Sequence, residues 1–141
     1  MIKRTKQVIV IRKDLGMRRG KEIAQGSHAS ISFLTRPLKN TANENPDDWG
    51  NWAGYHEGIL HLTPVQLSWI KESFAKVCVR VNSEEELMAV KAKAEEIGVE
   101  CHLIQDSGKT EFGGVPTYTC LAVGPDWKER VDLVTGDLEL Y

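Results

Sequence analysis

The sequence predicts an α/β fold in which a sheet of four strands has both parallel and antiparallel neighbours. Three observations predict it: a continuous Val/Ile run within 7–14, a strand–helix–strand order over 75–106, and a fourth alternating segment at 117–124. The chain has 141 residues, 41% of them hydrophobic, which is enough for one ordinary domain to bury a core. One domain over residues 1–141 is therefore expected.

The first strand and helix follow from local pattern. QVIVIRKD at 7–14 has the uninterrupted apolar run of a central strand covered on both faces. A helix is expected from about Lys21 to Phe33, and it should end before Pro37, since a proline disfavours helical geometry in the preceding residue. Residues 36–62 are rich in Asn, Asp, Gly and Pro without a sustained period. They should form a long irregular insertion.

A short helix should begin after this insertion. Thr63 is a good N-cap, a proline occupies the first helical position, and Gln66 completes a capping box. Leu67 and Ile70 are then expected to face inward.

The next elements predict a crossover unit. Alternating residues at 75–82 indicate a strand, and a helix should run from the N-cap Ser83 to the stop at Gly98. A third strand ending at Asp106 completes a right-handed unit with parallel strands. The fourth strand at 117–124 should pair antiparallel with the third, and the tail should form a short helix or turn and an extended end.

Charge is unevenly divided along the chain. The formal net charge is −2, but up to Lys21 eight basic residues stand against one acid, a charge of +7, which leaves −9 for the rest. Such asymmetry favours a directional field that attracts a polyanion such as nucleic acid. A solvated basic face is the plain alternative.

Several other classes of protein are disfavoured. The three isolated cysteines predict buried thiols of a cytoplasmic protein rather than a disulfide framework. The first apolar run has only four residues, too few for a signal peptide or a membrane span. The histidine and cysteine spacings predict no metal site, and no glycine-rich nucleotide motif is present.

The helix expected from Lys21 has two chemically different sides at about 100° per residue. The polar side consists of Lys21, Gln25, His28 and Ser32. The opposite side, expected to pack, consists of Ile23, Ser27, Ile31 and Leu34. An ordinary solvent-facing side is the plain alternative, but an ammonium, an amide and an imidazole in line are unusual for a solvated face, which favours a reactive surface. Arg18 and Arg19 precede the helix, whose N-terminal N–H groups suit a phosphate or an oxyanion.

Asp106 is the second chemical candidate because it ends the third strand and opens a glycine-rich loop. Ligands of open α/β sheets gather at the carboxyl ends of parallel strands, where the first helix also begins. We therefore expect Asp106 and Lys21 to be neighbours. The carboxylate would orient a water while the ammonium stabilises developing negative charge. An ordinary Asx turn is the alternative for Asp106.

Five blocks in this order resemble the type-two peptidyl-tRNA hydrolases, the archaeal and eukaryotic kind. They are KQVIVIRKDLGMRRGKEIAQGSHAS, KVCVRVNSEEEL, IQDSGKTEF, TYTCLAVGP and VDLVTGDLEL. The resemblance covers nearly the whole chain except about 36–62. It implies an enzyme that hydrolyses the ester between peptide and tRNA and recycles tRNA from aborted translation. It also implies a three-layer α/β/α fold with a four-stranded mixed sheet, a homodimer, and no cofactor.

The resemblance also implies site residues. The implied catalytic residues are Lys21, Gln25, Asp106, Thr110 and Thr119. The implied substrate-binding residues are Arg18, Arg19, His28, Lys109 and Thr117. As a hypothesis, the basic N-terminal segment grips tRNA phosphates, while Lys21, Gln25 and a threonine hydroxyl hold the ester carbonyl. The identity of the general base stays open, and a structural hydrogen bond is an equal reading of His28.

Two departures from the family pattern keep other functions open. Gly26 stands where a cysteine is frequent, and Glu111 stands where a glutamine is usual. Together with the insertion, they motivate an alternative: a non-catalytic tRNA-binding or protein-interaction module on the same fold. A nucleotide-binding flavodoxin-like domain is a third reading, disfavoured by the missing phosphate loop.

Overall fold

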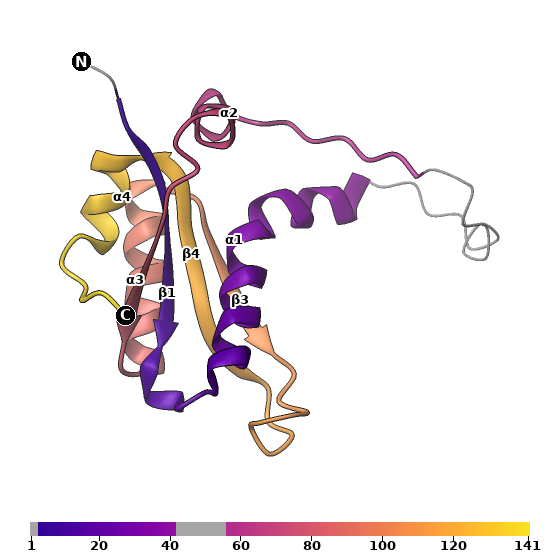
Figure 1. The fold of residues 1–141 in the computed structure, drawn as a ribbon, viewed down its shortest axis with the longest axis vertical. Coiled ribbons are helices and arrows are strands. Elements are labelled where there is room, and N and C mark those ends of the chain that lie inside the picture. Colours follow the sequence, from indigo (N-terminus) through magenta and orange to yellow (C-terminus); the bar gives the residue numbers. More distant parts are fainter. Residues whose placement is uncertain (1–2, 42–55) are drawn as a thin grey trace.

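A computed structural model describes residues 3–41 and 56–141, and in them it places one mixed sheet in the order β2-β1-β4-β3. The strands are β1 (Thr5–Arg12), β2 (Lys76–Val81), β3 (Cys101–Asp106) and β4 (Thr117–Trp127). β1 pairs parallel with β2 and antiparallel with β4, and β4 pairs antiparallel with β3. β1, β2 and β3 therefore run in one direction, and their carboxyl ends lie at the lower end of Figure 1. The central first strand and the antiparallel fourth strand are confirmed.

Helices cover both faces of this sheet, which confirms the three-layer α/β/α arrangement (Figure 1). They are α1 (Arg19–Thr41), α2 (Pro64–Lys71), α3 (Glu84–Ile97) and α4 (Lys128–Thr135), with a 3-10 turn η1 at Lys13–Leu15. Val8 and Val10 point toward α3 and α4 in the larger core cluster. Ile11 points to the other face, into a smaller cluster that includes Ala29 of α1. Alternate residues of β1 thus supply two cores, as its continuous apolar run requires.

The predicted helix caps are present. Gln66 N donates to Thr63 Oγ1 at 3.2 Å, and Thr63 N donates to Gln66 Oε1 at 2.9 Å, a complete capping box. Ser83 caps α3 with its side chain alone: Glu86 N donates to Ser83 Oγ at 3.0 Å, while the Glu86 carboxylate accepts from Asn82 N. Of the two inward residues predicted for α2, Leu67 is wrong because it is exposed, whereas Ile70 is half-buried; Trp69 fills the fully buried position. Its ring packs edge-on against Phe33 of α1 at 5.8 Å between centroids.

The predicted end of α1 is wrong, because the helix continues through Pro37 to Thr41. A proline inside a helix loses one backbone hydrogen bond and bends the axis rather than always ending it, and α1 changes direction in Figure 1. Arg36 fixes this part of α1 by donating to the carbonyl of Leu103 in β3. Within the predicted insertion, residues 36–41 are therefore helical. Residues 56–62 are irregular, and 42–55 lie outside the described residues.

The predicted packing side of α1 is also wrong. Ile23 and Ile31 are 64% and 50% exposed, whereas Gln25 of the polar side is only 3% exposed. The residues buried in α1 are Gln25, Gly26, Ala29, Ser30, Ser32 and Phe33. Small side chains let the helix lie close to the sheet, and its buried polar groups are hydrogen-bonded there. Ser30, for example, exchanges hydrogen bonds with Gln7 of β1.

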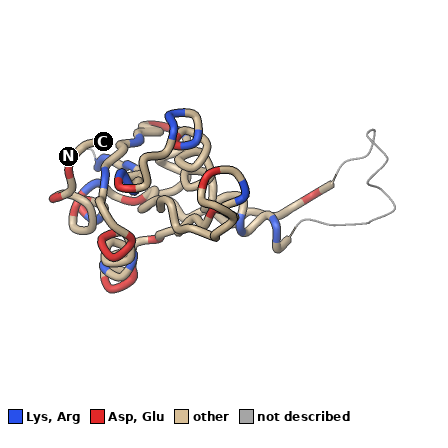
Figure 2. Tube along the Cα trace, turned by 90° about the horizontal axis from the view of Figure 1, so that it is seen from below, with Lys and Arg blue, Asp and Glu red and all other residues tan. Residues whose placement is uncertain are grey.

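The basic N-terminal residues do not form one surface. Lys6, at the start of β1, forms an ion pair with Asp132 of α4, whereas Arg18 and Arg19 lie beyond the opposite end of that strand. Acidic residues are concentrated on α3, which carries five glutamates among its 14 residues. Figure 2 shows red segments gathered on a helix seen end-on. Acidic residues are therefore concentrated on the face opposite α1.

The cysteines are partly as predicted. All three are free, but only Cys120 is fully buried, while Cys78 and Cys101 are intermediate. Burial raises the pKa of Cys101 and Cys120 to about 12, so both stay protonated and unsuited to nucleophilic attack. In residues 3–41 and 56–141, no helix combines the length and apolarity needed to cross a bilayer.

Candidate active site

The predicted proximity of Lys21 and Asp106 is confirmed, and two further polar side chains join them. Lys21 Nζ donates to Asp106 Oδ1 at 2.8 Å and to Thr110 Oγ1 at 3.0 Å. Gln25 Nε2 also donates to Asp106 Oδ1, at 3.3 Å. The two helical residues are one turn apart, so the start of α1 presents both to the end of β3. We call these four side chains the polar cluster.

The polar cluster keeps Asp106 ionised. The hydrogen bond from Lys21 is the largest cause that lowers the pKa of this carboxyl, and the backbone N–H of Gly108 adds to it. That N–H reaches Asp106 Oδ2 at 2.8 Å. Both carboxylate oxygens therefore accept hydrogen bonds, and the side chain is held in one orientation beside solvent.

Thr119 of β4 orients the amide of Gln25 from the sheet side of α1. Its hydroxyl donates to Gln25 Oε1 at 2.5 Å, so the NH₂ end of the amide faces Asp106. Thr119 is 0% exposed, which means that a substrate cannot contact it while this packing persists. We therefore expect Thr119, which the resemblance implies to be catalytic, to act by positioning Gln25.

Replacing Thr119 with the isosteric valine should release the Gln25 amide to rotate. We expect kcat to fall roughly tenfold or more, and the free energy of unfolding to fall by about 1 kcal/mol through loss of one hydrogen bond. Thr135→Val is the matched control, because Thr135 is also buried and bonds a carbonyl on α4. The control should lose stability without losing kcat. An unchanged kcat in Thr119→Val would remove the positioning role.

The loop after β3 folds over the start of α1. Gly108 has φ +81°, and a Cβ there would lie 2.0 Å from the Val115 carbonyl oxygen, so only glycine fits. Arg18 Nε donates to Glu111 Oε1 at 3.0 Å, and Lys21 Nζ lies 5.8 Å from the ring centroid of Phe112. Glu111 therefore ties the loop to the helix. Sequence reasoning missed Phe112, because no local pattern marks a loop aromatic as a partner of a distant lysine.

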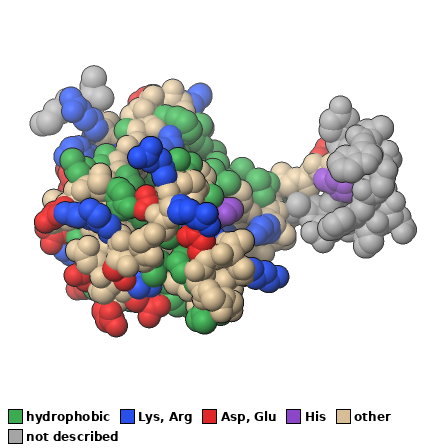
Figure 3. Space-filling view, turned by 60° about the horizontal axis from the view of Figure 1, so that its bottom comes forward, with side chains coloured by type: hydrophobic (Ala, Val, Ile, Leu, Met, Phe, Trp, Pro, Cys, Tyr) green, Lys and Arg blue, Asp and Glu red, His purple; other side chains and the backbone are tan. Residues whose placement is uncertain are grey.

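Other predicted residues lie around the polar cluster rather than in it. Arg19, His28 and Lys109 are exposed, and the Thr117 hydroxyl donates to the Val115 carbonyl at 2.9 Å. In Figure 3, which brings this end of the molecule forward, Lys and Arg side chains spread across the middle of the face with a histidine among them. Within residues 3–41 and 56–141, no group of three or more His, Cys, Asp or Glu side chains has a geometry that could hold a metal ion.

The arrangement defines a hydrolytic type of site on an α/β scaffold: an ionised carboxylate that can orient water, beside an ammonium and an amide that can polarise a carbonyl. The family model described as "Peptidyl-tRNA hydrolase PTH2" matches residues 5–141. The chain belongs to this family of peptidyl-tRNA hydrolases.

Individual relatives are similar to this chain over nearly its full length. The peptidyl-tRNA hydrolase of Methanocaldococcus jannaschii is 38% identical over 96% of this chain and 98% of its own. That of Thermococcus onnurineus is 40% identical over 97% and 98%. A probable peptidyl-tRNA hydrolase 2 of Dictyostelium discoideum is 40% identical over 96% of this chain and 54% of its own. A solved structure of an Agrobacterium protein of unknown function has a TM-score of 0.53 at 12% identity, covering 97% of each chain, and supports the fold alone.

Proposed function

We propose that this protein hydrolyses the ester bond between peptide and tRNA in peptidyl-tRNA and so recycles tRNA from aborted translation in the cytoplasm. The observation that carries the proposal is the polar cluster, in which Lys21, Gln25 and Thr110 surround the carboxylate of Asp106. In a member of the peptidyl-tRNA hydrolase family, this cluster is the group of side chains best placed to act on an ester.

Each member of the cluster retains capacity for the substrate. An ammonium has three N–H donors and Lys21 uses two, while the Gln25 amide has a second N–H besides the one directed at Asp106. These free donors suit the ester carbonyl and the oxyanion that forms when water attacks its carbon. Asp106 accepts a hydrogen bond from that water. As the water oxygen bonds to the ester carbon, the water gives up one proton to solvent. Collapse of the tetrahedral intermediate breaks the bond to the ribose oxygen, which takes up one proton from solvent and leaves with the tRNA, while the peptide leaves as its carboxylic acid.

The lowered pKa of Asp106 bears on its role. A general base works best when its pKa is near the operating pH, and the Lys21 hydrogen bond moves this carboxyl away from that range. We therefore assign Asp106 mainly to orienting the water and holding Lys21. Arg18, Arg19 and Lys109 supply sequence-independent contacts to tRNA phosphates, with His28 and Thr117 at the margin of the substrate.

Two of the three observations that motivated the non-catalytic alternative, Gly26 and Glu111, have a packing or pairing explanation; the third, the insertion, includes residues 42–55, which lie outside the described residues. A Cβ at Gly26 would only contact Ile9 and Ile11, at 3.7 and 3.9 Å, so this residue concerns packing against the sheet. Glu111 pairs with Arg18 and leaves the polar cluster assembled. The deciding experiment is release of free tRNA from an N-blocked aminoacyl-tRNA. If the wild type binds tRNA but releases no free tRNA from this substrate, the protein is instead a non-catalytic tRNA-binding module.

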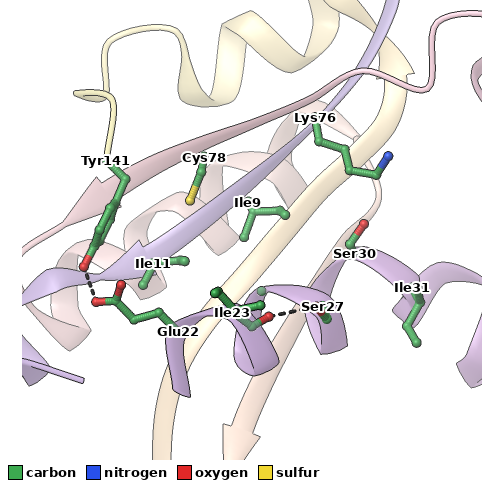
Figure 4. A pocket seen from close by; sticks show the side chains of 11 residues that line it. Ile9, Ile11, Glu22, Ile23, Ser27, Ser30, Ile31, Lys76, Cys78 and Tyr141 are labelled. Atoms are coloured by element: carbon green, nitrogen blue, oxygen red, sulfur yellow. Dashed lines mark hydrogen bonds between the residues drawn. The ribbon is translucent and has the colours of Figure 1, made fainter. Parts of the chain in front are cut away.

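We also propose a homodimer through the groove between α1 and strands β1 and β2. This groove has a volume of about 450 Å³ and is almost wholly apolar; its walls include Ile9, Ile23 and Cys78. Figure 4 shows these side chains between the helix and the two strands, with Tyr141 and Glu22 hydrogen-bonded at one end. An exposed apolar surface of this kind is typical of an interface. The family resemblance implies a second copy of the chain as its occupant.

A charge placed in the groove should separate the proposed dimer. We expect Ile23→Glu to give a monomer in light scattering where the wild type gives a dimer, because an ionised carboxylate would be buried unpaired at the interface. Leu133→Glu is the matched control, since Leu133 is 59% exposed on α4 across the sheet. A monomeric wild type, or a dimeric Ile23→Glu variant, would reject this interface.

A further inference from the structure

A second groove continues from the polar cluster along the other flank of α1. It has a volume of about 300 Å³. Its lining consists of His28, Ile31, Ser32, Thr35, Arg36, Lys39, Ile104 and Gln105. The strand side of the groove begins at Gln105, immediately before Asp106, and its helix side begins at His28, one turn after Gln25. The groove and the polar cluster are therefore contiguous.

The helix side of the groove extends the reactive side of α1. His28, Ser32, Arg36 and Lys39 follow Lys21 and Gln25 at spacings of three or four residues, so all lie along one side of the helix. From His28 to Lys39 the helix rises about 16 Å, several times the 3.4 Å spacing of stacked nucleotides. The groove is thus long enough for a short piece of an extended polymer that ends at the polar cluster.

The charge of the groove favours a polyanion. Its lining includes Arg36, Lys39 and the imidazole of His28, together with the hydroxyl of Thr35, and no aspartate or glutamate. Ile31 and Ile104 add apolar surface that can contact base faces. A peptide of variable sequence offers no constant partner for two cations, whereas every nucleotide brings a phosphate.

The strand side of the groove is closed to an added peptide strand. β3 is at the edge of the sheet, and such an edge can pair with an extended peptide through its backbone. Arg36 occupies this edge by donating to the Leu103 carbonyl and to His102 Nδ1, the latter at 3.0 Å. Neither direct partner is acidic, although His102 Nε2 contacts Glu100 at 2.7 Å, so Arg36 forms no ion pair of its own and its charge is left for the groove that it lines.

We propose that this groove binds the unpaired 3′ end of tRNA, the nucleotides that carry the peptidyl ester. The inference rests on the proposed function, because that end must reach the polar cluster for hydrolysis. Phosphates of the single strand lie along Arg36 and Lys39, and the terminal ribose lies beside His28 and Gln25. Arg18, Arg19 and Lys109, at the opposite end of the cluster, are left for phosphates of the paired acceptor stem.

The test compares one N-blocked amino acid esterified to full-length tRNA, to the trinucleotide CCA and to adenosine. Lys39→Ala should raise KM roughly two- to five-fold, the range of an exposed ion pair, for the first two substrates and leave the adenosine ester unchanged. Lys39→Glu should raise it further. The slope of log KM against log salt should fall by about 0.7 for one lost phosphate contact on a single strand. Arg19→Ala should raise KM only with full-length tRNA.

Lys93→Ala supplies the matched control, because Lys93 is an exposed lysine on α3 across the sheet; its three KM values should equal those of the wild type. An unchanged KM of Lys39→Ala with both tRNA and CCA would overturn the proposal. So would a KM of Lys39→Ala that is raised equally with the adenosine ester, because that substrate has no phosphate and the groove would then contact the acyl part. Binding of unacylated CCA can be measured without turnover. Weaker binding by Lys39→Glu than by the wild type supports the proposed site for the 3′ end even if the wild type fails to release tRNA. Equal binding by the two proteins rejects it.

Discussion

Asp106→Asn is expected to lower kcat for release of tRNA by about 10²- to 10⁴-fold, the usual contribution of a side chain that directs proton transfer or water. Asparagine has the same shape but loses the negative charge, and its NH₂ end would meet a donor in either orientation: the ammonium of Lys21 or the backbone N–H of Gly108, where accepting oxygens now lie 2.8 Å away. KM for tRNA should change little, since the phosphates bind elsewhere. Single-turnover and steady-state release assays would separate the two parameters.

The pH profile tests the protonation state of Asp106 in the wild type. Its pKa is lowered from 3.8, chiefly by Lys21, so the carboxylate form should persist as pH falls until the pH passes below that value. Between about pH 5 and pH 7, protonation of Asp106 should therefore not reduce kcat. Asp137→Asn, a change at an exposed acid, is the control and should match the wild type. If kcat of the wild type instead falls below about pH 6, and Asp106→Asn abolishes this dependence, Asp106 is a general base with a raised pKa.

The meeting of Lys21 and Asp106 could be predicted because it follows from topology. β1 and β3 run in the same direction, so the helix that follows β1 and the loop that follows β3 begin at the same edge of the sheet. The 85-residue separation of the two side chains is bridged by strand direction alone. The glycine-rich sequence after Asp106 predicted a loop there but not the path that the loop takes. Its contacts through Glu111 and Phe112 depend on tertiary packing that no local spacing encodes.

The error in α1 has a different origin. Angular periodicity placed Gln25 and Ser32 on one side of the helix, but hydrophobicity then selected the opposite side, with Ile23 and Ile31, for burial. The buried side is set instead by how closely the helix can approach the sheet. Gly26 and Ala29 allow a close approach, and Gln25 beside them is buried with its amide hydrogen-bonded at both ends. A buried polar group is tolerated when its partners are present, and those partners are invisible in the helix sequence.

The same geometry explains how one helix can serve three purposes. Its buried side fixes Gln25 above Thr119, its flank toward β3 carries the polar cluster and the second groove, and its flank toward β1 and β2 leaves an apolar surface. Because all three lie on one helix, the Gln25 amide and the proposed substrate contacts are carried by the same element. The continuation of α1 through Pro37, held by Arg36 on β3, extends that element beyond the cluster.

Lys21→Met should reduce kcat by about 10²- to 10³-fold, the effect of removing one donor to a developing oxyanion. Methionine keeps the length and flexibility of the chain but removes the charge and all three donors. The same change takes away the main hydrogen bond that lowers the pKa of Asp106, so this pKa should rise toward 3.8. Residual activity should then be lost at a higher pH than in the wild type as the solution is acidified. Full pH–rate profiles of both proteins measure this displacement.

Two further variants isolate the cause. Lys21→Arg retains a cation beside Asp106, so its acid limb should stay near that of the wild type even though the guanidinium fits the carbonyl less well and kcat is reduced. Lys93→Met makes the same chemical change on α3, far from the cluster, and should leave both kcat and the pH profile unaltered. A Lys21→Met protein that retains wild-type kcat would exclude the ammonium from the reaction. Lowered kcat without movement of the acid limb would instead show that Lys21 acts on the substrate but does not control the ionisation of Asp106.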